Sequence, residues 1–129
     1  MSIPVELDRL KEATDRYGPS AYLLTTGDDG RPHAVASAVL WDGERLVVSP
    51  GNRTRRNAGE RPLVSLVWPP PEPDGYTLIV DATAEVADGP AGPEVILTPT
   101  RGVLHRPGAA PVARPSCTSD CVPLLEPER

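Results

Sequence analysis

Four arginines crowd one stretch of this chain, and their spacing predicts an anion site. Arg53, Arg55 and Arg56 lie within the run NRTRRN, and Arg61 follows with only Glu60 to oppose the positive charge. A guanidinium pairs with a phosphate through two parallel hydrogen bonds, and backbone N–H groups at the start of a helical turn attract the same group. The alternative interpretation is a solvated, charged turn, because such clusters are common on protein surfaces.

Histidines and cysteines are the other candidates for chemistry. His33 or His105 could move a proton near neutral pH, but a histidine in a strand beside a turn is more simply a partly exposed polar residue. Cys117, Cys121 and His105 would supply three metal ligands, whereas a structural zinc site needs four. We therefore expect no metal site. No obvious constellation of general acid, base or nucleophile appears in the sequence, so the catalytic residues, if any, are not identified by it.

Composition limits the classes of partner and the type of core. A net charge of -5 over 129 residues argues against a protein that coats nucleic acid or an anionic membrane. The first residues, MSIPVELDRLKEATDR, resemble no signal peptide, and no apolar run approaches a membrane span, so we expect a soluble, cytoplasmic protein. With no Phe and 39% hydrophobic residues, the core must consist mainly of Val, Leu, Ile and Ala.

The elements that would position the arginines are predicted to be mainly β, in one domain. Turn signals such as Asp-Gly separate short runs rich in Val, Leu and Thr, which is typical of an antiparallel meander. An amphipathic helix is expected over residues 1–17, a barrel over 20–106 and a proline-rich tail over 107–129. The predicted strands are 20–26, 32–40, 45–49, 62–68, 76–87 and 94–106, the last with a kink at Pro99.

Two local patterns refine this expectation. Val35, Ser37 and Val39 alternate with three alanines, so the strand over 32–40 should present two different faces. The polar segment from Asn52 to Arg61 is compatible with a helix, which would make a short helix after strand three. Six strands are enough to close a barrel.

The stretch from Ala21 to Val86, about half of the chain, resembles the pyridoxamine 5′-phosphate oxidase-like, flavin-binding split-barrel proteins. The ordered segments AYLLTTGDDGRPHAVA, WDGERLVVS, NRTRRN, ERPLVSLVW and GYTLIVDATAEV carry the resemblance, and GVLHRP is similar to a late strand of small members. It implies a six-stranded antiparallel split β-barrel that forms a homodimer, with a cofactor in each of two clefts at the interface.

The resemblance also implies site residues. The cofactor phosphate would be held by residues of the turn after strand three, namely Arg53, Thr54, Arg55, Arg56 and Asn57. The ring would lie against strands two and three, which implicates His33, Val35, Ser37, Ser49 and Pro50. Thr54 stands where many relatives carry lysine, and this departure favours FMN over the deazaflavin cofactor, coenzyme F-420.

The implied activity is that of an oxidoreductase with FMN-dependent hydride transfer to or from a small organic substrate. The substrate-binding set of the true pyridoxamine 5′-phosphate oxidases has no counterpart here, so that substrate is not expected. Alternatives are a coenzyme F-420-dependent reductase and a non-catalytic protein that binds flavin or haem. A cofactor-free barrel that serves as a structural dimer or partner-binding module is a third possibility.

Overall fold

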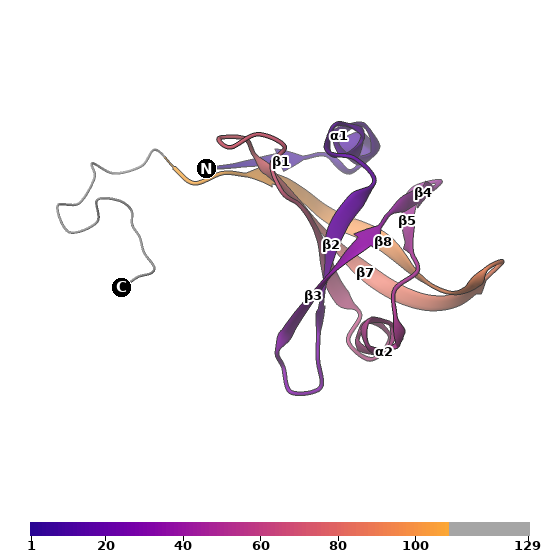
Figure 1. Ribbon diagram of the computed structural model, residues 1–129. Coiled ribbons are helices and arrows are strands. Elements are labelled where there is room, and N and C mark those ends of the chain that lie inside the picture. Colours follow the sequence, from indigo (N-terminus) through magenta and orange to yellow (C-terminus); the bar gives the residue numbers. More distant parts are fainter. Residues whose placement is uncertain (109–129) are drawn as a thin grey trace.

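A computed structural model describes residues 1–108, and one antiparallel sheet forms most of this part of the chain (Figure 1). Its eight strands are β1 (Ser2–Val5), β2 (Ser20–Thr26), β3 (Pro32–Ala38), β4 (Leu40–Asp42), β5 (Arg45–Val48), β6 (Leu63–Trp68), β7 (Thr77–Gly89) and β8 (Gly92–His105). A 3-10 turn, η1 (Leu7–Arg9), leads into α1 (Leu10–Tyr17), and α2 (Asn52–Glu60) follows β5. No helix of the described residues is long and apolar enough to cross a membrane.

The sheet curls but is not closed by hydrogen bonds. Its strand order is β3-β2-β6-β7-β8-β5-β4, and β1 adds to β8. The two edge strands, β3 and β4, are consecutive in the chain and separated only by Val39, so the sheet must bend until its edges approach each other. The mainly β, antiparallel class is confirmed, whereas the closed barrel is not. The described residues contain eight strands rather than six, because residues 2–5 and 40–42 form strands of their own.

The N-terminal segment differs from the prediction of one helix over residues 1–17. Residues 2–5 form β1, which pairs antiparallel with β8 from Ser2 opposite His105 to Val5 opposite Gly102. The helix itself begins only at Leu10. Side-chain spacing along 2–17 suited a helix, but pairing with a strand a hundred residues away determines the conformation of the first five residues.

The remaining strand predictions agree closely with the structure. β2 has the predicted bounds, and β6, β7 and β8 each differ by a few residues at their ends. The kink predicted at Pro99 is confirmed as a register shift, since Asp81 pairs with Arg101 while Ala82 pairs with Pro99. Thr100, left between them, donates a hydrogen bond from its hydroxyl to the Asp81 carbonyl over 3.2 Å.

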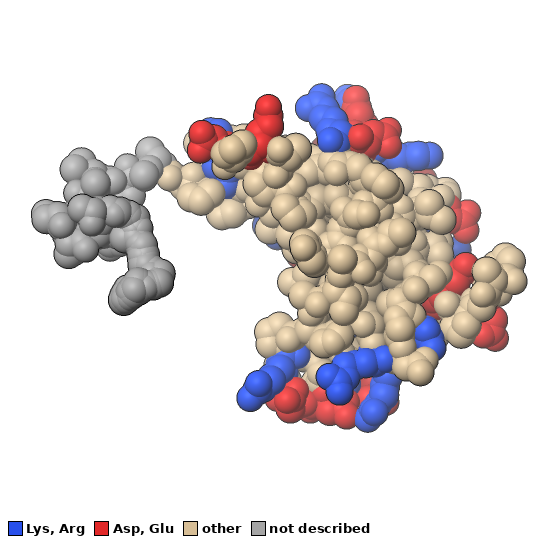
Figure 2. All heavy atoms as spheres, viewed as in Figure 1, with Lys and Arg blue, Asp and Glu red and all other residues tan. Residues whose placement is uncertain are grey.

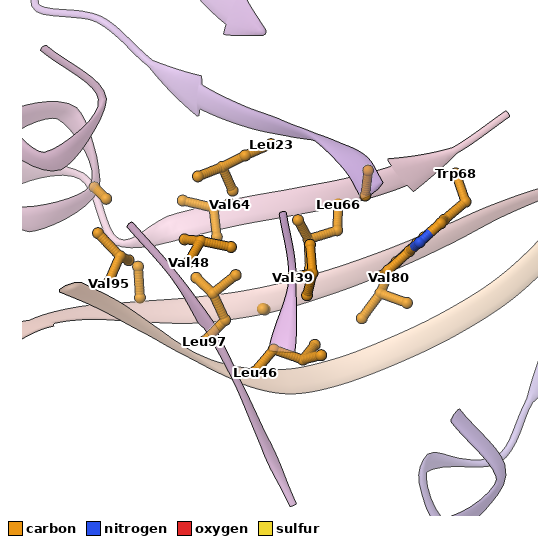
Figure 3. Packing of buried hydrophobic residues seen from close by; sticks show 14 of the residues in the cluster. Leu23, Val39, Leu46, Val48, Val64, Leu66, Trp68, Val80, Val95 and Leu97 are labelled. Atoms are coloured by element: carbon orange, nitrogen blue, oxygen red, sulfur yellow. The ribbon is translucent and has the colours of Figure 1, made fainter. Parts of the chain in front are cut away.

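The core lies inside the curl of the sheet and is aliphatic, as the composition predicted (Figure 3). Leu23, Leu46, Leu66, Val80 and Leu97 come from five different strands and are fully buried. Trp68 is the one large aromatic side chain among the fully buried residues described, and its indole N–H donates to the Gly18 carbonyl over 3.0 Å. This bond fixes the end of α1 against the sheet.

Candidate functional site

A groove of about 660 Å³ runs along the edge strand β3 and ends at the start of α2. It is lined by seven of the ten residues that the sequence predicted for a site, namely His33, Val35, Ser37, Ser49, Pro50, Arg53 and Thr54. A volume of this size is typical of small-molecule sites. Arg55, Arg56 and Asn57 do not line the groove.

The short helix α2 is anchored to the sheet by its buried side. Ala58 is fully buried, and the buried Asn57 side chain donates from Nδ2 to Thr25 Oγ1 on β2 over 3.2 Å. Asn57 therefore holds the helix in place. With its buried side against the sheet, α2 places its first residues, Asn52 to Thr54, at the end of the groove.

The arginines of this helix have different surroundings. Arg56 Nη2 lies 2.7 Å and Arg61 Nη2 2.6 Å from the carboxylate of Asp28, in the turn between β2 and β3. Arg55 donates to the Pro50 carbonyl over 2.5 Å and to the side-chain oxygen of Asn52. Arg53 has no hydrogen-bond or ion-pair partner within residues 1–108, so its charge is available to a ligand.

The start of α2 adds donors beside Arg53. Gly51 occupies the N-cap position, where no side chain caps the helix, and the first helical hydrogen bond runs from the Arg55 N–H to the Gly51 carbonyl over 3.0 Å. The preceding N–H groups have no partner within a helix and carry its partial positive charge. Thr54, although only 3% exposed, lines the same end of the groove. This corner is suited to an anion.

A second cavity, of about 450 Å³, continues from the groove toward the turn between β2 and β3. His33 and Arg53 line both cavities, and Arg56 and Asn57 line only the second. His33 Nδ1 is buried and is the one buried side-chain nitrogen or oxygen of the described residues without a hydrogen-bond partner.

Sequence reasoning missed several residues of the groove. Glu94 on β8 lines it because β5 pairs with β8, with Val48 opposite Val95. No spacing along the chain indicates that pairing. Leu40 and Asn52 also line the groove, and Asn52 could have been found because it opens the arginine run.

The weaker candidates lie elsewhere. His105 Nδ1 is 3.0 Å from Ser2 Oγ, where β1 pairs with β8, and takes no part in the groove. Cys117 and Cys121 lie outside the described residues. Among residues 1–108, no group of three or more His, Cys, Asp or Glu side chains could hold a metal ion.

Comparison with known proteins gives two kinds of relative. No protein-family model matches the chain. The uncharacterized proteins Mb0449c of Mycobacterium bovis and MT0457 of Mycobacterium tuberculosis are each 41% identical to this chain. Each alignment is 140 positions long and covers 95% of this chain and 96% of the relative.

Solved structures share the fold at lower identity. A putative pyridoxamine 5′-phosphate oxidase from Listeria innocua matches with a TM-score of 0.63 and 17% identity, over 77% of this chain and 98% of that one. A FAD-binding protein from Mycobacterium smegmatis matches with a TM-score of 0.59 and 17% identity, over 82% of this chain and 100% of that one. An F-420 reductase matches with a TM-score of 0.53 and 21% identity, over 64% of this chain and 87% of that one. At these identities the likeness concerns the fold.

Proposed function

Because this chain belongs to one family with the two mycobacterial proteins and has the fold of the pyridoxamine 5′-phosphate oxidase-like proteins, we propose that it binds a flavin-type cofactor. FMN and coenzyme F-420 are the two candidates that the sequence favoured. Both carry a phosphate on the chain that leaves the ring system. The phosphate would lie at the start of α2 and the ring along β3.

The observation that carries this proposal is the unpaired charge of Arg53 beside the uncapped start of α2. Three neighbouring arginines are held by protein acceptors, whereas Arg53, Thr54 and the first N–H groups of the helix converge on one end of the groove. Guanidinium, hydroxyl and helix N–H groups together are the donors that phosphate prefers. The alternative, a solvated and charged surface turn, accounts for Arg56 and Arg61, which form ion pairs with Asp28. It accounts less well for Arg53, which lines the groove without such a pair among the described residues.

The side wall of the groove is suited to a flat ring. Val35, Ala36, Ala38 and Pro50 are small or apolar, and Ser37 and Ser49 add hydroxyl groups. When bound, such a cofactor supplies hydride transfer, and the protein needs only to bind, orient and partly desolvate it. We propose an oxidoreductase that acts on a small organic substrate.

A second copy of the chain would complete the site. Ala36, Tyr22, Val67 and Ile79 form a row across β3, β2, β6 and β7 on the face of the sheet opposite the core. Tyr22 is 46% exposed, and an exposed apolar row on a sheet is typical of a protein interface. We propose a homodimer that uses this face, with a cofactor groove close to the interface.

The test begins with the full-length protein as purified. Its absorbance spectrum and the mass of any ligand released on denaturation would identify the bound molecule. A yellow protein that is bleached by a nicotinamide reductant supports the oxidoreductase, whereas a Soret band supports the haem alternative. Failure of the ligand-free protein to bind FMN, FAD or coenzyme F-420 in a titration would contradict the proposed function.

Arg53→Ala is expected to weaken binding of FMN about 10- to 100-fold, because it removes a charge-assisted hydrogen bond to the phosphate worth about 1.5–3 kcal/mol. Fluorescence titration measures the change. Arg9→Ala is the matched control, since Arg9 is an exposed arginine paired with Glu12 over 3.1 Å, outside both cavities. An unchanged affinity of Arg53→Ala would show that the phosphate lies elsewhere.

A further inference from the structure

A separate groove, of about 550 Å³, lies between α1, the ends of β1 and β8, and the loop that joins β6 to β7. Figure 1 shows α1 at the end of the molecule opposite α2, and Figure 2 shows charged side chains over α1 and over this loop. This α1 groove shares no residue with the two cavities of the candidate site. Its occupant is therefore not the cofactor.

The α1 groove opens onto the hydrophobic core. Six hydrophobic residues of the described chain are only partly buried against the core, and four of them line this groove, namely Val5, Ala13, Tyr17 and Leu104. Removing apolar surface of this kind from water is favourable. The groove is thus suited to a segment with large aliphatic side chains.

Two tyrosines join the opposite walls of the groove. Tyr17 on α1 donates its hydroxyl proton to the carbonyl of Tyr76, at the end of the loop, over 2.7 Å, which holds the helix and the loop together. A groove that is already formed costs less to occupy than one that must first be ordered. Aromatic side chains along a groove are also typical of sites that bind extended, proline-containing segments.

The charged side chains of the groove are unevenly paired. Arg9 and Glu12 lie 3.1 Å apart and neutralise each other, whereas Arg16 on α1 and Glu72 on the loop have no ion-pair partner within residues 1–108. A segment with a carboxylate on the side of α1 would pair with Arg16 and avoid Glu72. These charges therefore favour one orientation of an acidic, apolar segment.

The part of the chain that the structure describes ends at the edge of this groove. Arg106, directly after β8, stacks its guanidinium 4.5 Å from the centre of the Tyr76 ring and donates to the Asp74 carbonyl over 3.4 Å. An extended chain spans about 3.5 Å per residue, so residues 109–121 are long enough to span about 45 Å. That is ample for a return to the groove, and so short a tether gives the segment beyond it a high local concentration.

One segment of the proline-rich tail matches the groove in composition. Val122, Leu124 and Leu125 are three of the four large aliphatic residues of the tail. Glu126 follows them directly and supplies a carboxylate. Pro123 lies among them and restricts the chain before binding, which lowers the entropy cost of ordering it.

We propose that residues 122–126 bind in the α1 groove of the same chain, with Leu124 and Leu125 against its apolar residues and Glu126 toward Arg16. The tail would then cover core residues that the sheet and α1 leave partly exposed. The inference does not depend on the proposed function, because the α1 groove and the cofactor site share no residue.

The proximity can be measured in the full-length protein, because Cys117 and Cys121 are its only cysteines. A nitroxide is attached to Cys121 of the Cys117→Ser protein. It should strongly broaden the NMR signals of residues 9–17 and 71–76, which border the groove. The signals of α2 (Asn52–Glu60), at the opposite end of the molecule, should change little.

Variants of the tail decide the question, because an unbound tail would also stay near its point of attachment. The double variant Leu124→Ser/Leu125→Ser should remove most of the broadening at the groove. Val112→Ser is the matched control in the same tail and should keep it. Equal broadening in the double variant and the control would overturn the inference.

A charge exchange tests the orientation. Arg16→Glu and Glu126→Arg should each remove part of the broadening, and the two together should restore it, since the ion pair re-forms with opposite signs. Glu128→Arg is the control and should have little effect. A double variant that shows no recovery would contradict the contact between Glu126 and Arg16.

A mixed sample distinguishes the same chain from a second copy. Isotope-labelled protein without the nitroxide is mixed with unlabelled protein that carries it, so any broadening comes from another molecule. We expect the signals of the groove to be unaffected. Broadening that the double serine variant removes would assign the groove to the tail of a second copy and overturn the proposal.

Discussion

Tyr17 shows how a single side chain makes stability depend on pH. Its hydroxyl donates to the Tyr76 carbonyl over 2.7 Å, and burial raises the pKa of Tyr17 above its usual value of 10.0, although Arg16 partly opposes that shift. The unfolded chain therefore loses this proton at a lower pH than the folded chain. The resulting stabilisation is present below about pH 10 and is lost as the pH rises through the folded-state pKa.

The corresponding variant is Tyr17→Phe, which should lower the free energy of unfolding at pH 7 by about 1 kcal/mol through the lost hydrogen bond. It should also remove part of the decline in stability above pH 10. Urea unfolding at pH 7 and in the alkaline range measures both effects, with the exposed Tyr22→Phe as control. If the free energy of unfolding of Tyr17→Phe falls above pH 10 as steeply as that of the native chain, groups other than Tyr17 cause the pH dependence.

The arginine run also shows which part of the site the sequence could predict. Residue types and order were enough to predict an anion site at α2, which stays a prediction, and Arg53 and Thr54 line the groove proposed for it. They could not show that Arg56 is bound by Asp28, because the two residues are 28 positions apart and meet only when the hairpin folds beside the helix. Long-range ion pairs therefore decided which arginine is left for a ligand.

Among the elements, the N-terminal segment depends on one close approach to β8. Leu10 at the start of α1 is fully buried and lies over Gly102, where an added Cβ would come within 2.5 Å of the Leu10 side chain and 3.3 Å of the Val5 carbonyl. The local pattern predicted β2 and β6 well because their alternation is confined to a few residues. It failed for β1, whose partner β8 is adjacent in the sheet but about a hundred residues away along the chain.

Gly102→Ala should therefore destabilise the fold, since Leu10 must move away from the new methyl group. Overpacking of this kind costs about 1–3 kcal/mol, which corresponds to a fall in Tm of several degrees for a domain of this size. Thermal unfolding measures it, with Gly108→Ala as control because nothing lies within 4 Å of a Cβ there. If both variants have the same Tm as the native chain, Leu10 does not pack closely enough against Gly102 of β8 to be displaced by a methyl group.

The molecule as a whole has a sheet with two different faces, and the proposed dimer depends on the outer one. Tyr22 lies in the middle of the apolar row, between Ala36 and Val67. A carboxylate buried at that position in a dimer would lie unpaired in apolar surroundings, which is strongly unfavourable. In an isolated chain the same carboxylate would stay in water, so the substitution should affect association much more than folding.

Tyr22→Glu is therefore expected to convert a dimer into a folded monomer, which sedimentation or light scattering would detect, while Tyr22→Phe should leave the dimer intact. Because the groove is proposed to lie near the interface, the monomer should also bind the cofactor less tightly than the dimer does. A dimer that persists in Tyr22→Glu would place the interface on another face. A monomer with undiminished cofactor affinity would show that one chain supplies the whole site, and the groove lined by β3, the start of α2 and Glu94 would then suffice by itself.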